Sequence, residues 1–205
     1  MPTSTNQDPF HQVFGPPAIA VPRMHFRGAG LEHMMTRRLA HTGSGWFLGR
    51  MFQLFGDGLD RLNPCVEAWS FLLPPALERW LIIGFNAYGA LLLLDEAGEK
   101  GTVAPIWMID PLTVTCFGHS QLYLYSLLDD WLPNRRLPRF LDTAVYEQYL
   151  RTAGSLLEND EILGIHAPLP LGGSMQLDNF SRVDIIDYYA ATAPVYREAL
   201  ERTKQ

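Results

Sequence analysis

Apolar residues recur along this chain at two spacings, which predict helices in some segments and strands in others. Between Leu31 and His41 they lie three or four positions apart, as on one face of an amphipathic helix, and 43–45 (Gly-Ser-Gly) ends that helix. A second helix is expected to begin at Asn63 and Pro64, because asparagine caps a first turn and proline fits the first helical position. The segment from Trp46 to Phe55 leads from the first helix to a turn at 56–58.

The densest apolar segments lie in the middle of the chain and predict β-strands. Trp80 to Phe85 and Gly89 to Asp95 are rich in isoleucine and leucine, so we expect a hairpin that is covered on both faces. Ala104 to Ile109 and Leu112 to Phe117, hinged at Asp110-Pro111, extend the same sheet. Four strands in sequence order predict an antiparallel meander.

The second half of the chain is expected to be mainly helical. With Ser120 as N-cap, Gln121 to Leu132 has helical spacing, and Arg139 to Leu156 predicts a second long helix. A last helix should start at Asp184, and Pro194 either kinks it or starts a new one, since proline inside a helix removes a hydrogen bond. The predicted class is therefore α+β, a mostly antiparallel sheet flanked by helices with a smaller helical C-terminal portion.

The first 23 residues differ from the rest, since they hold five prolines among polar and small residues. This composition predicts an extended or mobile arm, which can dock on the body only through a few apolar side chains. These side chains are Phe10, Val13, Phe14 and Ile19. We divide the chain into this arm (1–23), an α+β portion (24–119) and a C-terminal portion (120–205), packed as one compact body.

The net charge of the chain limits the classes of partner that it is expected to bind. The chain has 205 residues, 47% of them apolar, and its 16 basic and 22 acidic residues give a net charge of 16 − 22 = −6. Such a chain repels nucleic-acid phosphates, so we expect no direct nucleic-acid binding and favour a cationic partner. Arg135, Arg136 and Arg139 form a small basic patch, but without interleaved aromatic residues it is more typical of a solvated face.

Neither a membrane segment nor a secretion signal is expected. The longest apolar run, Leu81 to Leu94, is interrupted by Asn86 and Gly89 and is shorter than the roughly 20 residues that cross a bilayer. Residues 1–8 lack a basic and an apolar region. We therefore expect a cytoplasmic protein with no membrane partner.

Few residues look chemically reactive. Cys116 and His119 are either a nucleophilic pair or, as we favour, a buried strand cysteine beside a loop histidine, because a reactive cysteine needs an electropositive and partly exposed site. His25, His33 and His41 recur every eight residues, which differs from the i, i+4 spacing of metal ligands. We expect no enzymatic activity, no catalytic residue, no metal and no cofactor.

The segment from Leu157 to Asp184 has the most specific order of residues. An acidic corner at 158–161 is followed by an apolar segment with two prolines, a Gly-Gly-Ser turn at 172–174 and a polar helix start. It resembles the C-terminal signature of the GAD-like immunity proteins of bacterial type VI secretion. Three more segments, 56–64, 83–95 and 106–111, resemble other parts of that family, so the likeness covers roughly residues 40–190.

This resemblance implies that 24–119 is a GAD-like portion and 120–205 an immunity-type portion. It also implies a function: binding and neutralising a co-produced antibacterial toxin, often a DNase, by occluding its active site. A basic nuclease site suits acidic groups, so our partner-binding candidates are Asp57, Asp60, Asp129, Asp130, Glu158, Asp160 and Glu161. The alternative is a non-enzymatic regulatory scaffold, related to cell-wall-regulatory domains, that binds cellular proteins.

Overall fold

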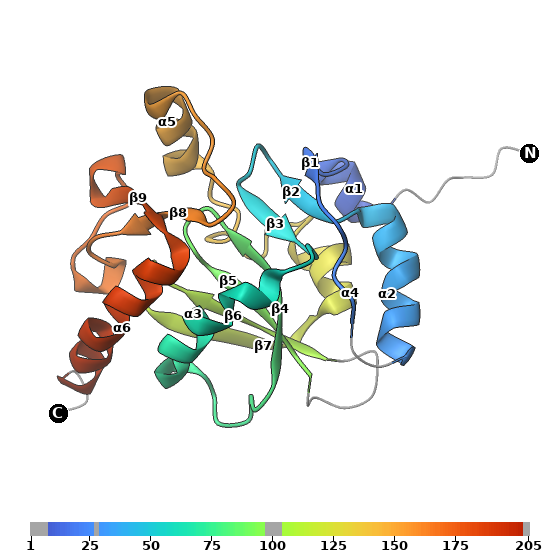
Figure 1. Ribbon diagram of the computed structural model, residues 1–205, viewed down its shortest axis with the longest axis horizontal. Coiled ribbons are helices and arrows are strands. Elements are labelled where there is room, and N and C mark those ends of the chain that lie inside the picture. Colours follow the sequence, from blue (N-terminus) through green and yellow to red (C-terminus); the bar gives the residue numbers. More distant parts are fainter. Residues whose placement is uncertain (1–7, 27–28, 97–103, 203–205) are drawn as a thin grey trace, which may run out of the picture.

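A seven-stranded antiparallel sheet forms the centre of the protein (Figure 1). The computed structural model describes residues 8–26, 29–96 and 104–202. Neighbouring strands in the sheet are also neighbours in sequence, which confirms the α+β class and the predicted meander. The strands are β1 (Ile19–Ala20), β2 (Gly45–Phe47), β3 (Phe52–Leu54), β4 (Trp80–Asn86), β5 (Leu91–Asp95), β6 (Pro105–Asp110) and β7 (Thr115–Tyr123).

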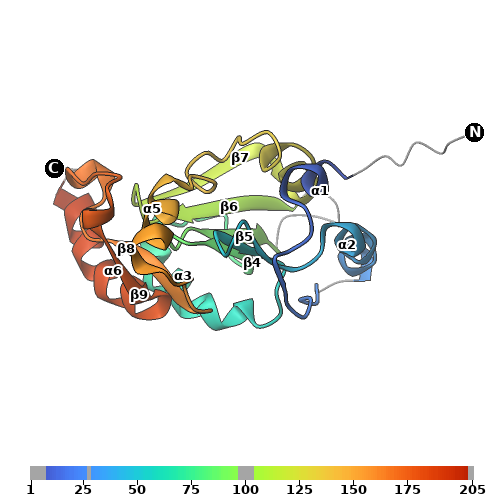
Figure 2. The ribbon, with the colours of Figure 1, turned by 90° about the horizontal axis from the view of Figure 1, so that it is seen from above.

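Helices gather at the two ends of this sheet. Figures 1 and 2 show the first two helices at one end and the C-terminal elements at the other. The helices before the last strands are α1 (Pro9–Phe14), α2 (Ala29–Thr42), η1 (Leu59–Leu62), α3 (Asn63–Ala68), η2 (Ser70–Leu72), α4 (Leu124–Ser126), η3 (Leu127–Trp131) and α5 (Ala144–Ala153). The C-terminal elements are β8 (Glu161–Ile165), η4 (Leu169–Leu171), η5 (Leu177–Asn179), β9 (Phe180–Asp184) and α6 (Ile185–Arg202).

The N-terminal segment is part of the folded body, so the predicted extended arm is wrong for residues 8–23; residues 1–7 lie outside the described residues. The predicted docking is confirmed for Phe10 and Phe14, whereas Val13 and Ile19 are exposed. Phe10 is fully buried and meets Phe47 edge to face, with 5.0 Å between the ring centroids. The carboxylate of Asp8 caps α1 and forms an ion pair with Arg38 at 2.8 Å. Aromatic packing and a buried acid therefore outweigh the proline content of this segment.

A hairpin of β2 and β3 occupies the segment from Trp46 to Phe55, which the sequence predicts only as a connection. The two strands pair over three residues, and β3 then pairs with β4. Gly45 is required where β1 pairs with β2, because a Cβ atom there would lie 2.1 Å from the carbonyl oxygen of Ile19. The sheet is therefore three strands wider than the sequence predicted.

The helix predicted from Gln121 begins later. Strand β7 continues to Tyr123, which pairs with Pro105, and the chain becomes helical only in α4. Ser120 is therefore not the N-cap; the hydroxyl of Ser126 accepts a hydrogen bond from the Tyr123 N–H instead. Sheet pairing has overridden the local helical pattern.

The start of one other predicted helix and the cap of another are also corrected, although α3 begins at Asn63 as predicted. The helix expected from Arg139 begins at Ala144, where the carboxylate of Asp142 accepts the Ala144 N–H. Asn63 does not cap α3, because its side-chain oxygen accepts a hydrogen bond from the indole of Trp80. The last helix starts as predicted.

The C-terminal elements pack against the turn between β4 and β5. The N–H of Leu163 in β8 donates to the Ala87 carbonyl at 2.7 Å, and the Tyr189 hydroxyl donates to the Gly89 carbonyl at 2.8 Å. Gly89 has a φ of +82°, and a Cβ there would lie 2.8 Å from Ile162, so a tight glycine turn brings the two parts together. Helix α6 runs through Pro194 without a new helix starting there.

Candidate functional site

Two of the predicted acidic clusters lie in tight turns at the protein surface. Asp57 and Asp60 are exposed beside Gly58, which has a left-handed φ of 75° and opens η1. The Asp57 carboxylate accepts the N–H of Gly58 at 3.0 Å. The second cluster, 158–161, forms the turn before β8.

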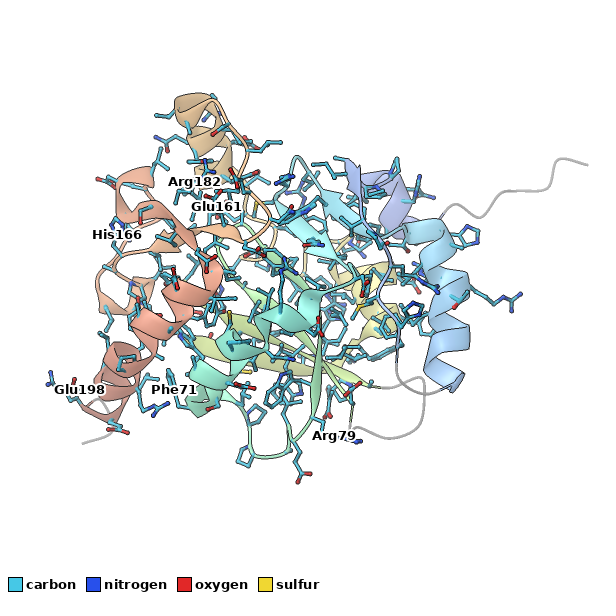
Figure 3. All side chains as sticks on the ribbon, in the orientation of Figure 1. Phe71, Arg79, Glu161, His166, Arg182 and Glu198 are labelled. Atoms are coloured by element: carbon cyan, nitrogen blue, oxygen red, sulfur yellow. The ribbon has the colours of Figure 1, made fainter. Side chains whose placement is uncertain are left out.

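Arg182 holds the second turn in shape. It forms ion pairs with Glu161 at 2.5 Å and with Glu158 at 3.4 Å, and Figure 3 shows Glu161 and Arg182 close to each other. The hydrogen bond from Arg182 lowers the pKa of Glu161, which also accepts the Glu158 N–H at 2.7 Å. Glu158 nevertheless remains 80% exposed, so the turn still presents negative charge to solvent.

Arg61 joins the two turns, although they lie about 100 residues apart in the sequence. Its Nε atom is 2.6 Å from the Asp160 carboxylate, and its Nη1 atom donates to the Gly58 carbonyl at 2.8 Å. The two acidic segments are therefore held side by side through one guanidinium group.

We call the surface around these turns the acidic face. Two hollows lie on it, of about 520 and about 280 Å³, the first next to Asp160 and the second next to Asp60. Its acids are Asp57, Asp60, Glu67, Glu78, Glu96, Glu158, Asp160, Glu161 and Asp184, and its arginines are Arg50, Arg61, Arg79 and Arg182. These thirteen residues carry 4 − 9 = −5, which is most of the net charge of the chain.

Asp129 and Asp130 lie elsewhere, beside the N-terminal elements. Asp129 forms an ion pair with Arg38 of α2 at 2.5 Å, and Asp130 pairs with Arg136. Hydrogen bonds from Asn134 and Arg136 lower the pKa of Asp130. Each acid pairs with an arginine, although Arg38 also pairs with Asp8. The structure brings together two of the three predicted clusters and leaves this one apart.

The sequence analysis missed part of the acidic face. Glu67, Glu78 and Glu96 are isolated acids in the sequence, and nothing in their local pattern marks them. Glu78 and Glu96 come together because β4 and β5 pair, as the bond from the Glu96 N–H to the Arg79 carbonyl shows.

Cys116 and His119 do not form a nucleophilic pair. They are three residues apart on β7, so their side chains project to opposite faces of the strand. Burial raises the pKa of the Cys116 thiol to about 11, which keeps it protonated at neutral pH. The ring of His119 lies against Trp131, with 5.0 Å between centroids.

The described residues contain neither a cluster of metal-ligand side chains nor a membrane-spanning helix. No group of three or more His, Cys, Asp or Glu side chains is placed to hold a metal ion among these residues, and the side chain of His33 lies outside them. None of the helices in those residues is both long and apolar enough to cross a bilayer.

Comparison with known proteins bears on the fold alone. No protein-family model matches the chain, and no curated protein matches it. The crystal structure of Atu4351 from Agrobacterium tumefaciens is similar, with a TM-score of 0.58 and 18% identity over 90% of this chain and 87% of that one. The resemblance to the immunity family therefore rests on the sequence segments alone.

Proposed function

We propose that this protein is an immunity protein that neutralises a co-produced type VI secretion toxin, a DNase, by binding over its active site. The observation that carries the proposal is the acidic face, whose thirteen charged residues sum to −5 and include the two tied turns. A DNase must attract phosphate, so its active site is basic and complementary to such a surface. The interaction would take place in the bacterial cytoplasm, where the toxin meets the chromosome.

The turns of the acidic face are tied by ion pairs to arginines. Arg61 and Arg182 hold the turns in place before any partner arrives, so less conformational entropy is lost on binding. Complementary charge raises association rates by about 10- to 1,000-fold. The larger hollow, of about 520 Å³, has room for a lysine or arginine side chain of the toxin.

The test uses the DNase encoded beside this gene, with and without the protein. We expect a stoichiometric complex that stops DNA nicking. Changing Asp57 and Asp60 together to lysine should lower the association rate constant at least tenfold, on the order of the steering effect above. The control is Glu198→Lys, an exposed site on α6 that Figure 3 shows far from Glu161.

Three outcomes would decide against the proposal. The first is no complex at micromolar concentration. The second is full inhibition by the double variant at the wild-type rate, which would remove the role of the acidic face. The third is a complex in which nicking continues, which would favour the regulatory scaffold instead.

A further inference from the structure

A second surface feature lies away from the acidic face, beside the last two strands of the sheet. The segment from Trp131 to Phe140 contains three arginines and no acidic residue. It runs along β7 (Figure 2) and encloses, with β6 and β7, a cavity of about 240 Å³. The lining residues are Met108, Phe117, Arg136, Leu137, Pro138 and Arg139.

The inner wall of this cavity is apolar. Met108 and Phe117 are cross-strand partners, so their side chains share one face of the sheet. Met108 and Leu137 are buried, and the ring of Phe117 packs against Trp131 with 6.2 Å between centroids. A hydrocarbon group that enters the cavity therefore meets carbon on several sides.

The outer rim is cationic. The side chains of Arg136 and Arg139 are 46% and 49% exposed, whereas Met108 and Leu137 in the wall are buried and Phe117 is half-buried. The Nε atom of Arg139 lies 3.0 Å from the buried carboxylate of Asp110. Arg136 pairs with Asp130 and lies over the Trp131 ring at 4.9 Å from its centroid. Both groups are therefore held at the rim.

The segment also carries two unfavourable features. Arg135 has a φ of +53°, and the buried indole nitrogen of Trp131 has no hydrogen-bond partner in the described structure. Each costs on the order of 1–3 kcal/mol, and such features cluster at binding sites. Each lining arginine is paired with one acid, Arg136 with Asp130 and Arg139 with Asp110, but a guanidinium group has five N–H donors, so donors beyond these ion pairs face a ligand.

We propose that this cavity binds an apolar group that ends in a carboxylate, either a free carboxylic acid or the C-terminal residue of a peptide. The wall takes the hydrocarbon, and the guanidinium groups of Arg136 and Arg139 donate to the carboxylate oxygens, whose planar geometry they match. A cavity of about 240 Å³ lies below the roughly 300 Å³ at which sites for drug-sized ligands begin, so the ligand is one aromatic or branched group. This activity does not depend on the acidic face.

Isothermal titration calorimetry with N-acetylphenylalanine tests the site. We expect a dissociation constant below ~1 mM, as for a ligand of this size. N-acetylphenylalanine amide has the same shape without the charge and should bind at least tenfold more weakly. Titration with 4-phenylbutyrate distinguishes a free carboxylic acid from a peptide C-terminus as the ligand. Tighter binding of N-acetylphenylalanine identifies a C-terminus, and tighter binding of 4-phenylbutyrate identifies a free acid.

Two variants locate the binding. Arg136→Gln should weaken N-acetylphenylalanine at least tenfold, whereas Arg135→Gln, next to it but outside the lining, should leave the affinity within about twofold. Equal affinities for acid and amide, equal effects of the two variants, or no heat at several millimolar would each overturn the proposal. Circular dichroism of both variants confirms that each is folded.

Discussion

Arginine partners decide how much negative charge each acidic cluster presents to solvent. Arg61 and Arg182 pair with the acidic turns and leave Glu158 exposed. Arg38 pairs with both Asp8 and Asp129, and Arg136 pairs with Asp130. The turns therefore keep more uncompensated acid than the cluster at Asp129 and Asp130.

The pair of Glu161 and Arg182 predicts a pH-dependent stability. Replacing Glu161 with glutamine should lower the free energy of unfolding by about 0.5–1 kcal/mol at neutral pH, the range of a well-placed surface pair. Because Arg182 lowers the folded-state pKa of Glu161 below its ordinary value of 4.5, this stabilisation is present above that pH and disappears as the pH falls through the folded-state pKa. Urea unfolding of the wild type and of Glu161→Gln at neutral pH and at about pH 3 measures the difference in their free energies of unfolding at each pH.

The control for this prediction is Glu198→Gln, which removes an exposed i,i+4 pair with Arg202. Its effect should stay below about 0.5 kcal/mol at either pH. A difference between wild type and Glu161→Gln that grows on acidification would contradict the assigned pKa direction.

Sequence reasoning found the acids of the turns but not the surface they form. Asp57, Asp60 and the acids of 158–161 stand beside turn residues, and that local signal is readable. The contact of Arg61 with Asp160 spans 99 positions, and the contact of Arg38 with Asp129 spans 91. No local pattern encodes which arginine meets which acid, so the grouping of clusters required the fold.

At the scale of elements, the length of a strand determined whether its sequence pattern could predict it. Strands β4 to β6 have five to seven residues with apolar character throughout, and their pairing was predictable. Strands β1 to β3 have only two or three residues, which is too short to display a period of two. They form because β3 pairs with the edge of β4 and β2 then pairs with β3, so their existence depends on tertiary contacts.

Helix α1 gives an element-scale prediction. Phe10 is 0% exposed and contacts Phe47 and Phe52, so Phe10→Ala should lower the free energy of unfolding by about 3–5 kcal/mol. Val13 lies on the same helix but is 47% exposed, so Val13→Ala should change it by less than about 0.5 kcal/mol. Urea unfolding of both variants measures the contrast, and similar small losses would mean that the N-terminal segment does behave as an undocked arm.

Over the whole molecule, charge is unevenly divided. The acidic face holds −5 of the net −6, while the rim at Arg136 and Arg139 presents two guanidinium groups, each paired with one acid. Added salt should therefore weaken binding at both sites, although the two sites bind partners of opposite charge. Because they share no lining residue, occupying one leaves the groups of the other in place.

The C-terminal elements should not unfold separately from the sheet. Buried bonds cross between them: Leu163 to Ala87, Tyr189 to Gly89, and the indole of Trp69 to the Tyr189 carbonyl at 3.1 Å. Separation would expose Trp69, which is fully buried, and leave these polar groups unpaired, at about 1–3 kcal/mol for each group.

We therefore expect the full chain to unfold in a single transition, with far-UV and near-UV circular dichroism coinciding in guanidinium chloride. A chain that ends at residue 156 should fail to fold, because it uncovers Trp69 and the turn at Gly89 together. The control is Val195→Ala, a 58% exposed site on α6, which should change the free energy of unfolding by less than about 0.5 kcal/mol. Two separate transitions, or a cooperative transition in the shortened chain, would show instead that the sheet and the C-terminal elements are independent domains.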